Sequence, residues 1–291
     1  MNYRIIILLI IALLSVSTSP IVAKSLYGVP AVSISFWRML IGSVLLWIYS
    51  YFYRNGKMKN KDNYFKTILA GILLGLHFAL FFGAIKLTLI SNATFLGTLA
   101  PLFTLIFEIF ILKRKFNYKV LFGLGLSFIG AYMIFGNDFN LSEKYVLGNL
   151  LAIICSLCLA LCFMIAEKVR QIENTIVYTR LLYLSAASTL FIIALINNTP
   201  LLGFNNYEYL GLIFLGIVPT IIGHNAIYYS VKYVSPTIVS AFPLGEPIIA
   251  TILAFFIFGE SIGLNIYIGG SITFLGLILI TMQKQLFNAD N

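Results

Sequence analysis

The sequence predicts an all-α integral membrane protein with ten transmembrane helices, arranged as two inverted five-helix repeats. Three observations predict this class. The 291 residues are 60% hydrophobic and only 10% charged, which leaves too few polar side chains to cover a soluble globule of this size. Apolar segments of membrane-spanning length follow one another with short connections. The second half of the chain aligns with the first half when it is shifted back by 146 residues.

Each predicted span has about 20 mostly apolar residues, the length that crosses the hydrocarbon core. In chain order the spans cover residues 4–26, 31–53, 64–86, 91–113, 118–136, 145–167, 174–196, 208–231, 236–258 and 263–283. The first span also resembles a secretory signal, because Arg4 precedes an apolar run. Its removal would unbalance the repeat, so we expect an uncleaved helix. The first repeat is expected over residues 1–140 and the second over residues 141–291.

The duplication is seen in matched residues within the apolar segments. Pro247 falls on Pro101 under the shift of 146 residues, and a shift of 142 places Arg180 on Arg38. Further matches are the pairs Gly269 with Gly123, Gly276 with Gly130, Phe274 with Phe128 and Lys232 with Lys86. Beside these prolines the halves differ, since Glu246 precedes Pro247 whereas Ala100 precedes Pro101. Internal duplication of membrane spans is typical of transporters.

Basic residues predict the orientation of the spans. Most of the 19 lysines and arginines lie on one side, chiefly in the connections 54–66 and 113–119, whereas the other side carries Lys24, Lys86 and Lys144. The positive-inside rule then places both termini of this multi-pass chain in the cytoplasm. Five spans per half make the second half enter from the opposite side. Topology explains the net charge of +9, so no nucleic-acid partner is expected.

Glu246 is the strongest candidate for a functional residue. It lies near the middle of the ninth predicted span, where a charged side chain costs about 2.5–3.5 kcal/mol on insertion scales. We expect it to bind a substrate amine or the coupling proton. A protonated, hydrogen-bonded glutamate that joins two helices is the structural alternative. Pro247 and, in the fourth span, Pro101 are expected to kink their helices and to act as hinges.

Two histidines, two arginines and an asparagine in the spans are the next candidates. His224 and Asn225 lie near the middle of the eighth span, and His224 either exchanges a proton or packs against a neighbouring helix. His77 lies one position from the repeat equivalent of His224, which favours a shared central cavity. Arg38 and Arg180 could hold a substrate carboxylate, but their duplication favours structural bonds to helix-end carbonyls. Glu108 and Glu260 are weaker candidates.

The sequence contains no pattern typical of an enzyme or a metal site. Cys155, Cys158 and Cys162 share a helix face, but no histidine or carboxylate alternates with them, so small-residue packing is expected. There is no phosphate-binding glycine loop, no carboxylate pair at hydrolytic spacing and no nucleotide-binding domain. We therefore expect no enzyme activity, no metal, no other cofactor and no drive from ATP.

Several motifs together resemble the EamA family of the drug/metabolite transporter superfamily. They are Phe36–Arg38, Asn92–Ala93 followed by Ala100–Pro101, Ile222–Asn225, Lys232–Ser235, Leu244–Pro247 and Phe258–Glu260. One departure is Lys113–Lys115, where the family often has an acidic residue. The resemblance implies a ten-helix inverted-repeat carrier, commonly an inner-membrane exporter or exchanger of amino acids and related metabolites.

These observations predict a secondary transporter that exports small metabolites such as amino acids by alternating access. An importer or exchanger of a nucleoside-like or sugar-like metabolite is the alternative within this class. A membrane-embedded lipid-modifying enzyme and a channel or scaffold are the alternatives from other classes. The expected partners are a small-molecule substrate and the lipid bilayer; proton coupling and a homodimer are left open.

Overall fold

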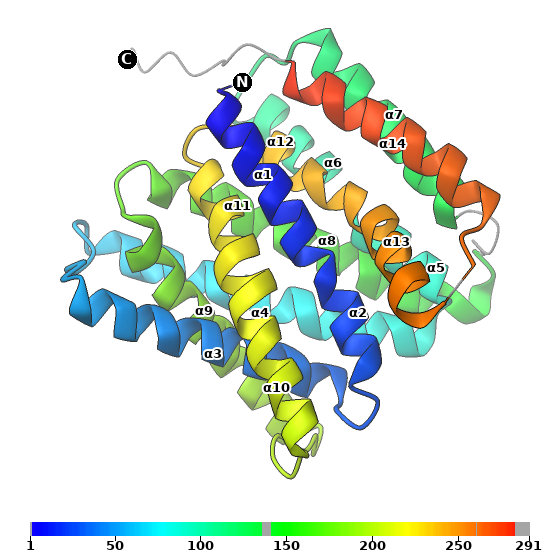
Figure 1. Cartoon of the computed structure of the whole chain (residues 1–291). Coiled ribbons are helices and arrows are strands. Elements are labelled where there is room, and N and C mark those ends of the chain that lie inside the picture. Colours follow the sequence, from blue (N-terminus) through cyan, green and yellow to red (C-terminus); the bar gives the residue numbers. More distant parts are fainter. Residues whose placement is uncertain (1, 136–140, 260, 283–291) are drawn as a thin grey trace.

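The computed structural model describes residues 2–135, 141–259 and 261–282, and Figure 1 shows their path. Ten helical segments in these ranges are long and apolar enough to cross a membrane, and each lies within a few residues of its predicted span. The helical elements are α1 Tyr3–Val16, α2 Thr18–Ser25, α3 Ala31–Phe52, α4 Asp62–Leu87, α5 Ile90–Gly97, α6 Ala100–Ile106, η1 Phe107–Ile111, α7 Tyr118–Phe135, η3 Glu143–Tyr145, α8 Val146–Arg170, α9 Thr175–Ile196, α10 Asn206–Leu215, η4 Gly216–His224, α11 Asn225–Ser230, α12 Pro236–Ala241, η5 Phe242–Gly245, α13 Glu246–Phe258 and α14 Leu264–Thr281.

Four spans are interrupted close to a proline. The first span breaks between α1 and α2 just before Pro20, and the fourth breaks between α5 and α6 just before Pro101. The eighth contains Pro219 inside the π-helical element η4, and the ninth passes through the 3-10 turn η5 before Pro247. A proline has no N–H to donate and crowds the carbonyl four residues earlier, so it disturbs the helix on its N-terminal side.

Helices α7 and α14 lie side by side in Figure 1 and contact each other through repeat-equivalent residues. The Ser127 hydroxyl donates to the Thr273 carbonyl at 3.3 Å, and the Thr273 hydroxyl donates to the Ser127 carbonyl at 3.5 Å. These two residues are equivalent under the shift of 146 residues. A residue that contacts its own equivalent reciprocally lies on a two-fold axis, which is consistent with the predicted inverted repeat.

Small residues allow α7 and α14 to approach closely. Gly123 packs on the Gly276 backbone, and Gly130 packs on the Gly269 backbone. A Cβ atom built on Gly130 would lie 2.4 Å from the carbonyl oxygen of Gly269, so the contact requires glycine.

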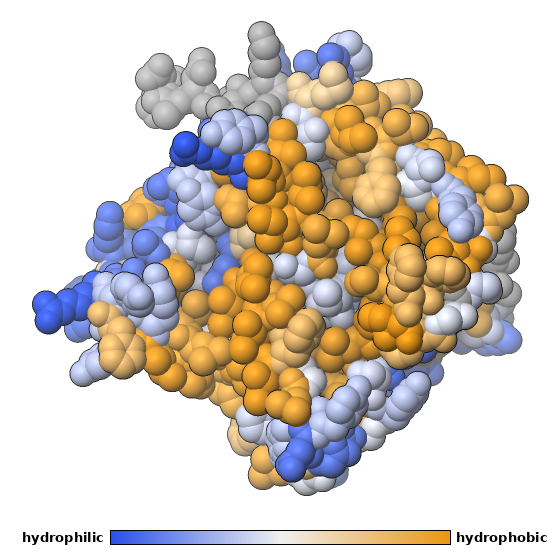
Figure 2. Space-filling view, viewed as in Figure 1, coloured by the Kyte–Doolittle hydropathy of each residue, from blue (hydrophilic) through white to orange (hydrophobic). Residues whose placement is uncertain are grey.

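The outer surface is largely apolar. Figure 2 shows a broad hydrophobic area over α1 and α13, while hydrophilic residues gather at the edge that carries the connection between α3 and α4. Large apolar side chains are exposed on this surface, including Phe256 at 77% and Ile257 at 59%. Such exposure suits a lipid-facing surface, since hydrocarbon solvates these side chains.

The connection between α3 and α4 is fixed by one buried acid. The Glu173 carboxylate accepts hydrogen bonds from the N–H groups of Lys59 and Asn60 and from the Asn63 side chain, all between 2.9 and 3.1 Å. Burial alone would raise the pKa of Glu173, but these hydrogen bonds and the Lys59 charge hold it below its ordinary value. Glu173 thus anchors the start of α4 to the turn before α9.

Candidate substrate site at the interface of the two repeats

The π-helical element η4 presents Thr220 to Arg38. Pro219 cannot donate to the carbonyl of Leu215, and the Thr220 hydroxyl donates to that carbonyl instead at 2.9 Å. The same hydroxyl oxygen accepts from Arg38 Nε at 3.3 Å, while Arg38 Nη1 donates to Ser19 Oγ in α2 at 3.1 Å. Arg38 is therefore a buried cation held between the first, second and eighth spans.

Glu246 interacts with the charge of Arg38 but makes no direct contact with it. It occupies the first turn of α13, immediately after the turn η5, and its side chain is partly exposed. The positive charge of Arg38 acts on the Glu246 carboxyl. Within the described residues, no hydrogen bond and no ion pair shorter than 4.0 Å holds the Glu246 side chain. The two opposite charges are thus near one another, yet neither neutralises the other by direct contact.

The two histidines belong to the same neighbourhood. His77 Nδ1 lies 3.1 Å from the carbonyl oxygen of Cys155, and a neutral ring that donates there keeps Nε2 as an acceptor. His224 Nδ1 is buried and has no hydrogen-bond partner in the described part of the chain. The positive charge of Arg38 acts on His224. His224 therefore offers an unused buried nitrogen beside the Arg38 cation.

Asn225 is oriented by a buried tyrosine. Tyr183 in α9 is fully buried, and its hydroxyl donates to Asn225 Oδ1 at 2.9 Å, with the Thr220 carbonyl oxygen 3.3 Å from the same hydroxyl. The contact leaves the Asn225 Nδ2 group as a potential donor to a ligand.

The structure thus brings together five of the predicted residues. We call Arg38, His77, His224, Asn225 and Glu246 the central polar group. The first two belong to the first repeat and the other three to the second repeat. Pro101 and Pro247 each mark a helix interruption, and Pro247 adjoins this group.

Arg180 lies elsewhere, although it is the repeat equivalent of Arg38. Its guanidinium donates to Ser50 Oγ and, at 2.6 Å, to the carbonyl of Gly56 after the end of α3. It also lies over the Trp47 ring, 4.1 Å from the ring centroid. These are structural contacts, the role that the duplication of the arginines favoured. Arg180 does not share the partners of Arg38, which are Thr220 and Ser19.

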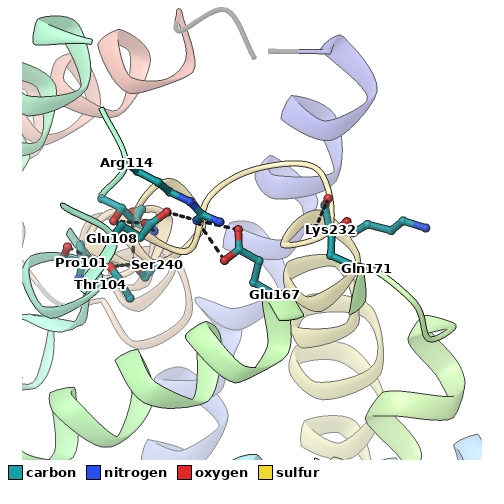
Figure 3. A network of polar contacts seen from close by, with 9 residues as sticks. Pro101, Thr104, Glu108, Arg114, Glu167, Gln171, Lys232 and Ser240 are labelled. Atoms are coloured by element: carbon teal, nitrogen blue, oxygen red, sulfur yellow. Dashed lines mark hydrogen bonds and ion pairs between the residues drawn. The ribbon is translucent and has the colours of Figure 1, made fainter. Parts of the chain in front are cut away.

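A second polar arrangement joins the repeats at the side predicted to be cytoplasmic (Figure 3). The Glu108 carboxylate in η1 is fully buried; it accepts from Arg114 at 2.6 Å and from the N–H and hydroxyl of Thr237 at 2.9 and 2.5 Å. Arg114 also pairs with Glu167 at the end of α8 at 2.8 Å. We call Glu108, Arg114, Glu167 and Thr237 the Glu108 cluster. Glu260, the other acid noted in the sequence, lies outside the described residues.

Sequence reasoning named Glu108 only as a weaker candidate and did not find this cluster. Partial burial alone would lower the pKa of Arg114, but its hydrogen bonds to Glu167 and Glu108 and their charges raise it, so Arg114 stays charged. The signal in the sequence that could have revealed the cluster is two acids near the ends of apolar spans and an arginine in a nearby connection. Which acid the arginine meets depends on packing between the repeats.

Ten apolar spans, a symmetric helix pair and a polar group inside the spans define a multi-pass membrane transporter. The chain belongs to the EamA-like transporter family, which matches residues 3–136 and again residues 146–282. The family resemblance of the motifs is thereby confirmed.

Individual relatives agree with this assignment. A protein of Archaeoglobus fulgidus named as an uncharacterized transporter is 26% identical over 87% of this chain and 88% of its own length. A Clostridium kluyveri protein of the same description is 27% identical over 67% of this chain, which spans a little under two thirds, 65%, of that relative. A solved crystal structure with 18% sequence identity has the same fold, with a TM-score of 0.84 over 97% of this chain and 98% of that one.

Proposed function

We propose that this transporter is a secondary carrier that exports small metabolites such as amino acids by alternating access. The observation that carries the proposal is the central polar group, in which Arg38 and Glu246 offer opposite charges within the membrane without a direct bond between them. An amino acid presents one carboxylate and one amine. Arg38 would hold the carboxylate and Glu246 the amine, with His224 and Asn225 adding hydrogen bonds.

Glu246 also suits coupling to protons. When no substrate amine is present, a partly exposed carboxylate inside the membrane avoids the cost of an unpaired charge by taking up a proton. The proton and the amine would then compete for Glu246, which gives exchange of one for the other. The two histidines are the alternative proton carriers.

The inverted repeat supports alternating access. Two halves related by an axis in the membrane plane can exchange conformations, and this opens a site between them to each side in turn. The central polar group draws residues from both halves, and Pro101 and Pro247 would serve as hinges at the helix interruptions. The proposed location is the cell inner (cytoplasmic) membrane, with both termini in the cytoplasm as the positive-inside rule predicts.

Counterflow in proteoliposomes tests the proposal. Vesicles loaded with an unlabelled mixture of the proteinogenic amino acids should accumulate the labelled mixture, because a carrier shows stimulation from the opposite side whereas a channel or scaffold does not. Glu246→Gln should abolish or uncouple this exchange while the protein stays folded. Glu143→Gln, a change at an exposed glutamate outside the central polar group, should leave it unchanged.

The result can also reject the assignment. Transport and pH dependence that are unchanged in Glu246→Gln would exclude Glu246 from the site. Counterflow with a nucleoside or sugar mixture, but not with amino acids, would favour the importer or exchanger alternative. The lipid-modifying enzyme is disfavoured because the polar residues lie inside the spans rather than as a reactive pair at the interface.

A further inference from the structure

A pocket of about 770 Å³ lies between the end of α3, the start of α9 and the connection that follows α3. It is separate from the central polar group and shares none of its residues. Helix α3 contributes Trp47, Ser50 and Tyr51, the connection contributes Arg54 and Lys57, and α9 contributes Arg180. None of the described residues that line it is acidic. The pocket therefore combines three positive charges with an aromatic wall.

Among the described residues, the buried cation Arg180 of the pocket has no acidic partner. Arg180 is 7% exposed, and no carboxylate lies within ion-pair distance of it among the described residues. Its two bonds to Ser50 and Gly56 use two of the five guanidinium donors. A buried cation without a counter-charge is costly, so an anionic ligand would be strongly favoured beside it.

The rim of the pocket provides further unused donors. The Arg54 and Lys57 side chains are exposed and make no hydrogen bond or ion pair in the described part of the chain. Arg54 adopts a left-handed backbone conformation with φ of 49°, which turns the chain sharply just after α3. In the same connection, Asn55 Nδ2 is buried without a hydrogen-bond partner among these residues.

The apolar wall lies where lipid meets water. Trp47 is 44% exposed, Tyr51 is 81% exposed and Phe52 is 74% exposed, at the end of a membrane span. Tryptophan and tyrosine favour this depth because their rings are apolar and carry a polar edge. A ligand with a phosphate at one end and hydrocarbon at the other fits both parts of the pocket.

We propose that this pocket binds the phosphate headgroup of an anionic phospholipid. The phosphate contacts Arg180, Arg54 and Lys57, and the acyl chains lie along Trp47 and the outer face of α3. The pocket is on the side that the basic connections assign to the cytoplasm, where anionic lipids attract basic segments. The bound lipid would tie α3 to α9, a helix pair drawn from the two repeats.

Trp47 gives a direct measurement of this binding. The chain has two tryptophans, and Trp37 is at the other end of α3, where it donates to the Leu201 carbonyl. The Trp37→Phe protein is reconstituted in bilayers that contain brominated phosphatidylglycerol or brominated phosphatidylcholine, and quenching of the Trp47 fluorescence is recorded. Subtracting the signal of a Trp47→Phe protein from that of the unmodified chain gives the same quantity without the Trp37 substitution.

We expect phosphatidylglycerol to quench Trp47 in preference to phosphatidylcholine. Arg54→Gln and Lys57→Gln should each weaken that preference about fivefold, the equivalent of about 1 kcal/mol per basic residue. The charge-matched substitutions Lys113→Gln and Lys115→Gln change exposed lysines in another connection on the same side and should leave it unchanged. A melting measurement on each variant verifies that it is folded.

Three results would overturn the proposal. Equal quenching by the two lipids would show that the pocket does not select an anion. A preference that survives the loss of both Arg54 and Lys57 would place the lipid elsewhere. Displacement of the lipid by inorganic phosphate at constant ionic strength would assign the pocket to a soluble phosphate compound instead.

Discussion

Removing the charge of Arg114 should destabilise the protein through the Glu108 cluster. In the substitution Arg114→Met, the side chain keeps much of its length but cannot pair with either acid. Glu108 would retain its hydrogen bonds from Thr237, whereas Glu167 would lose the partner that meets both of its oxygens. The variant therefore leaves two carboxylates near each other at the contact between the repeats.

The size of the effect follows from burial. The Glu108 side chain is 0% exposed and Glu167 is 3% exposed, while Arg114 is 28% exposed. Breaking a buried ion pair by removing one partner costs about 3–5 kcal/mol, and the partial exposure of Arg114 favours the lower end. A loss of about 3 kcal/mol corresponds to a decrease in Tm of about 5 °C for a chain of 291 residues.

The three buried cysteines Cys155, Cys158 and Cys162 provide the assay. A thiol-reactive fluorophore reports their exposure as the purified protein is heated in detergent. Lys115→Met is the matched control, since Lys115 is exposed and adjacent in sequence, and it should change stability by no more than about 0.5 kcal/mol. The double variant Arg114→Met with Glu167→Gln should recover part of the loss, because it removes one unpaired acid. If Arg114→Met and Lys115→Met melt at the same temperature, the Glu108 cluster does not stabilise the protein as argued.

Two further predictions concern the contact between α7 and α14 and the connection before α4. Gly130→Ala should destabilise the protein by about 1–3 kcal/mol through overpacking against Gly269. The control Gly125→Ala, with nothing within 4 Å of the added Cβ, should be neutral or stabilising in the same melting assay. Equal melting temperatures of the two variants would reject the close contact. Glu173→Gln should increase trypsin cleavage in the connection 54–61 relative to Asp62→Asn. The pKa of Glu173 is lowered in the folded state. The stability that its carboxylate contributes is therefore complete above the ordinary glutamate pKa of about 4.3 and is lost as the pH falls below it. The difference in cleavage between the two variants should accordingly disappear in acid. Resistance to trypsin that is the same in both variants at neutral pH would remove Glu173 as the anchor.

The number and position of the spans could be predicted because hydrophobic length is a local property of the chain. The interruptions were only partly predictable. Pro101 and Pro247 were identified through the repeat, but Pro219 has no proline at its repeat equivalent, and the π-helical turn it accompanies brings Thr220 to Arg38. Hydropathy does not reveal such a shift, since it preserves the apolar character of the span.

The partners of charged residues could not be predicted for a different reason. Arg114 was interpreted as a topology signal, and this is consistent with its place in a basic connection. Its pairing with Glu108 and Glu167 joins residues from two repeats, so it depends on how the halves pack. Arg38 and Arg180 were treated as one matched pair for the same reason, because alignment detects common origin but not present contacts.

The surroundings of those two arginines differ at the residue that precedes the matched proline. Glu246 gives Arg38 a nearby negative charge, and its repeat equivalent is Ala100, which has no charge to offer Arg180. Each half has a buried arginine, and among the described residues only Arg38 has an acid that acts on it. Arg38 and Glu246 are thus the pair that we propose a zwitterion bridges. Arg180 donates instead to a carbonyl and a hydroxyl and lies over the face of Trp47. Under this reasoning, introducing a glutamate for Ala100 would not create a second substrate site, because the Arg180 guanidinium is already directed toward the α3–α4 connection.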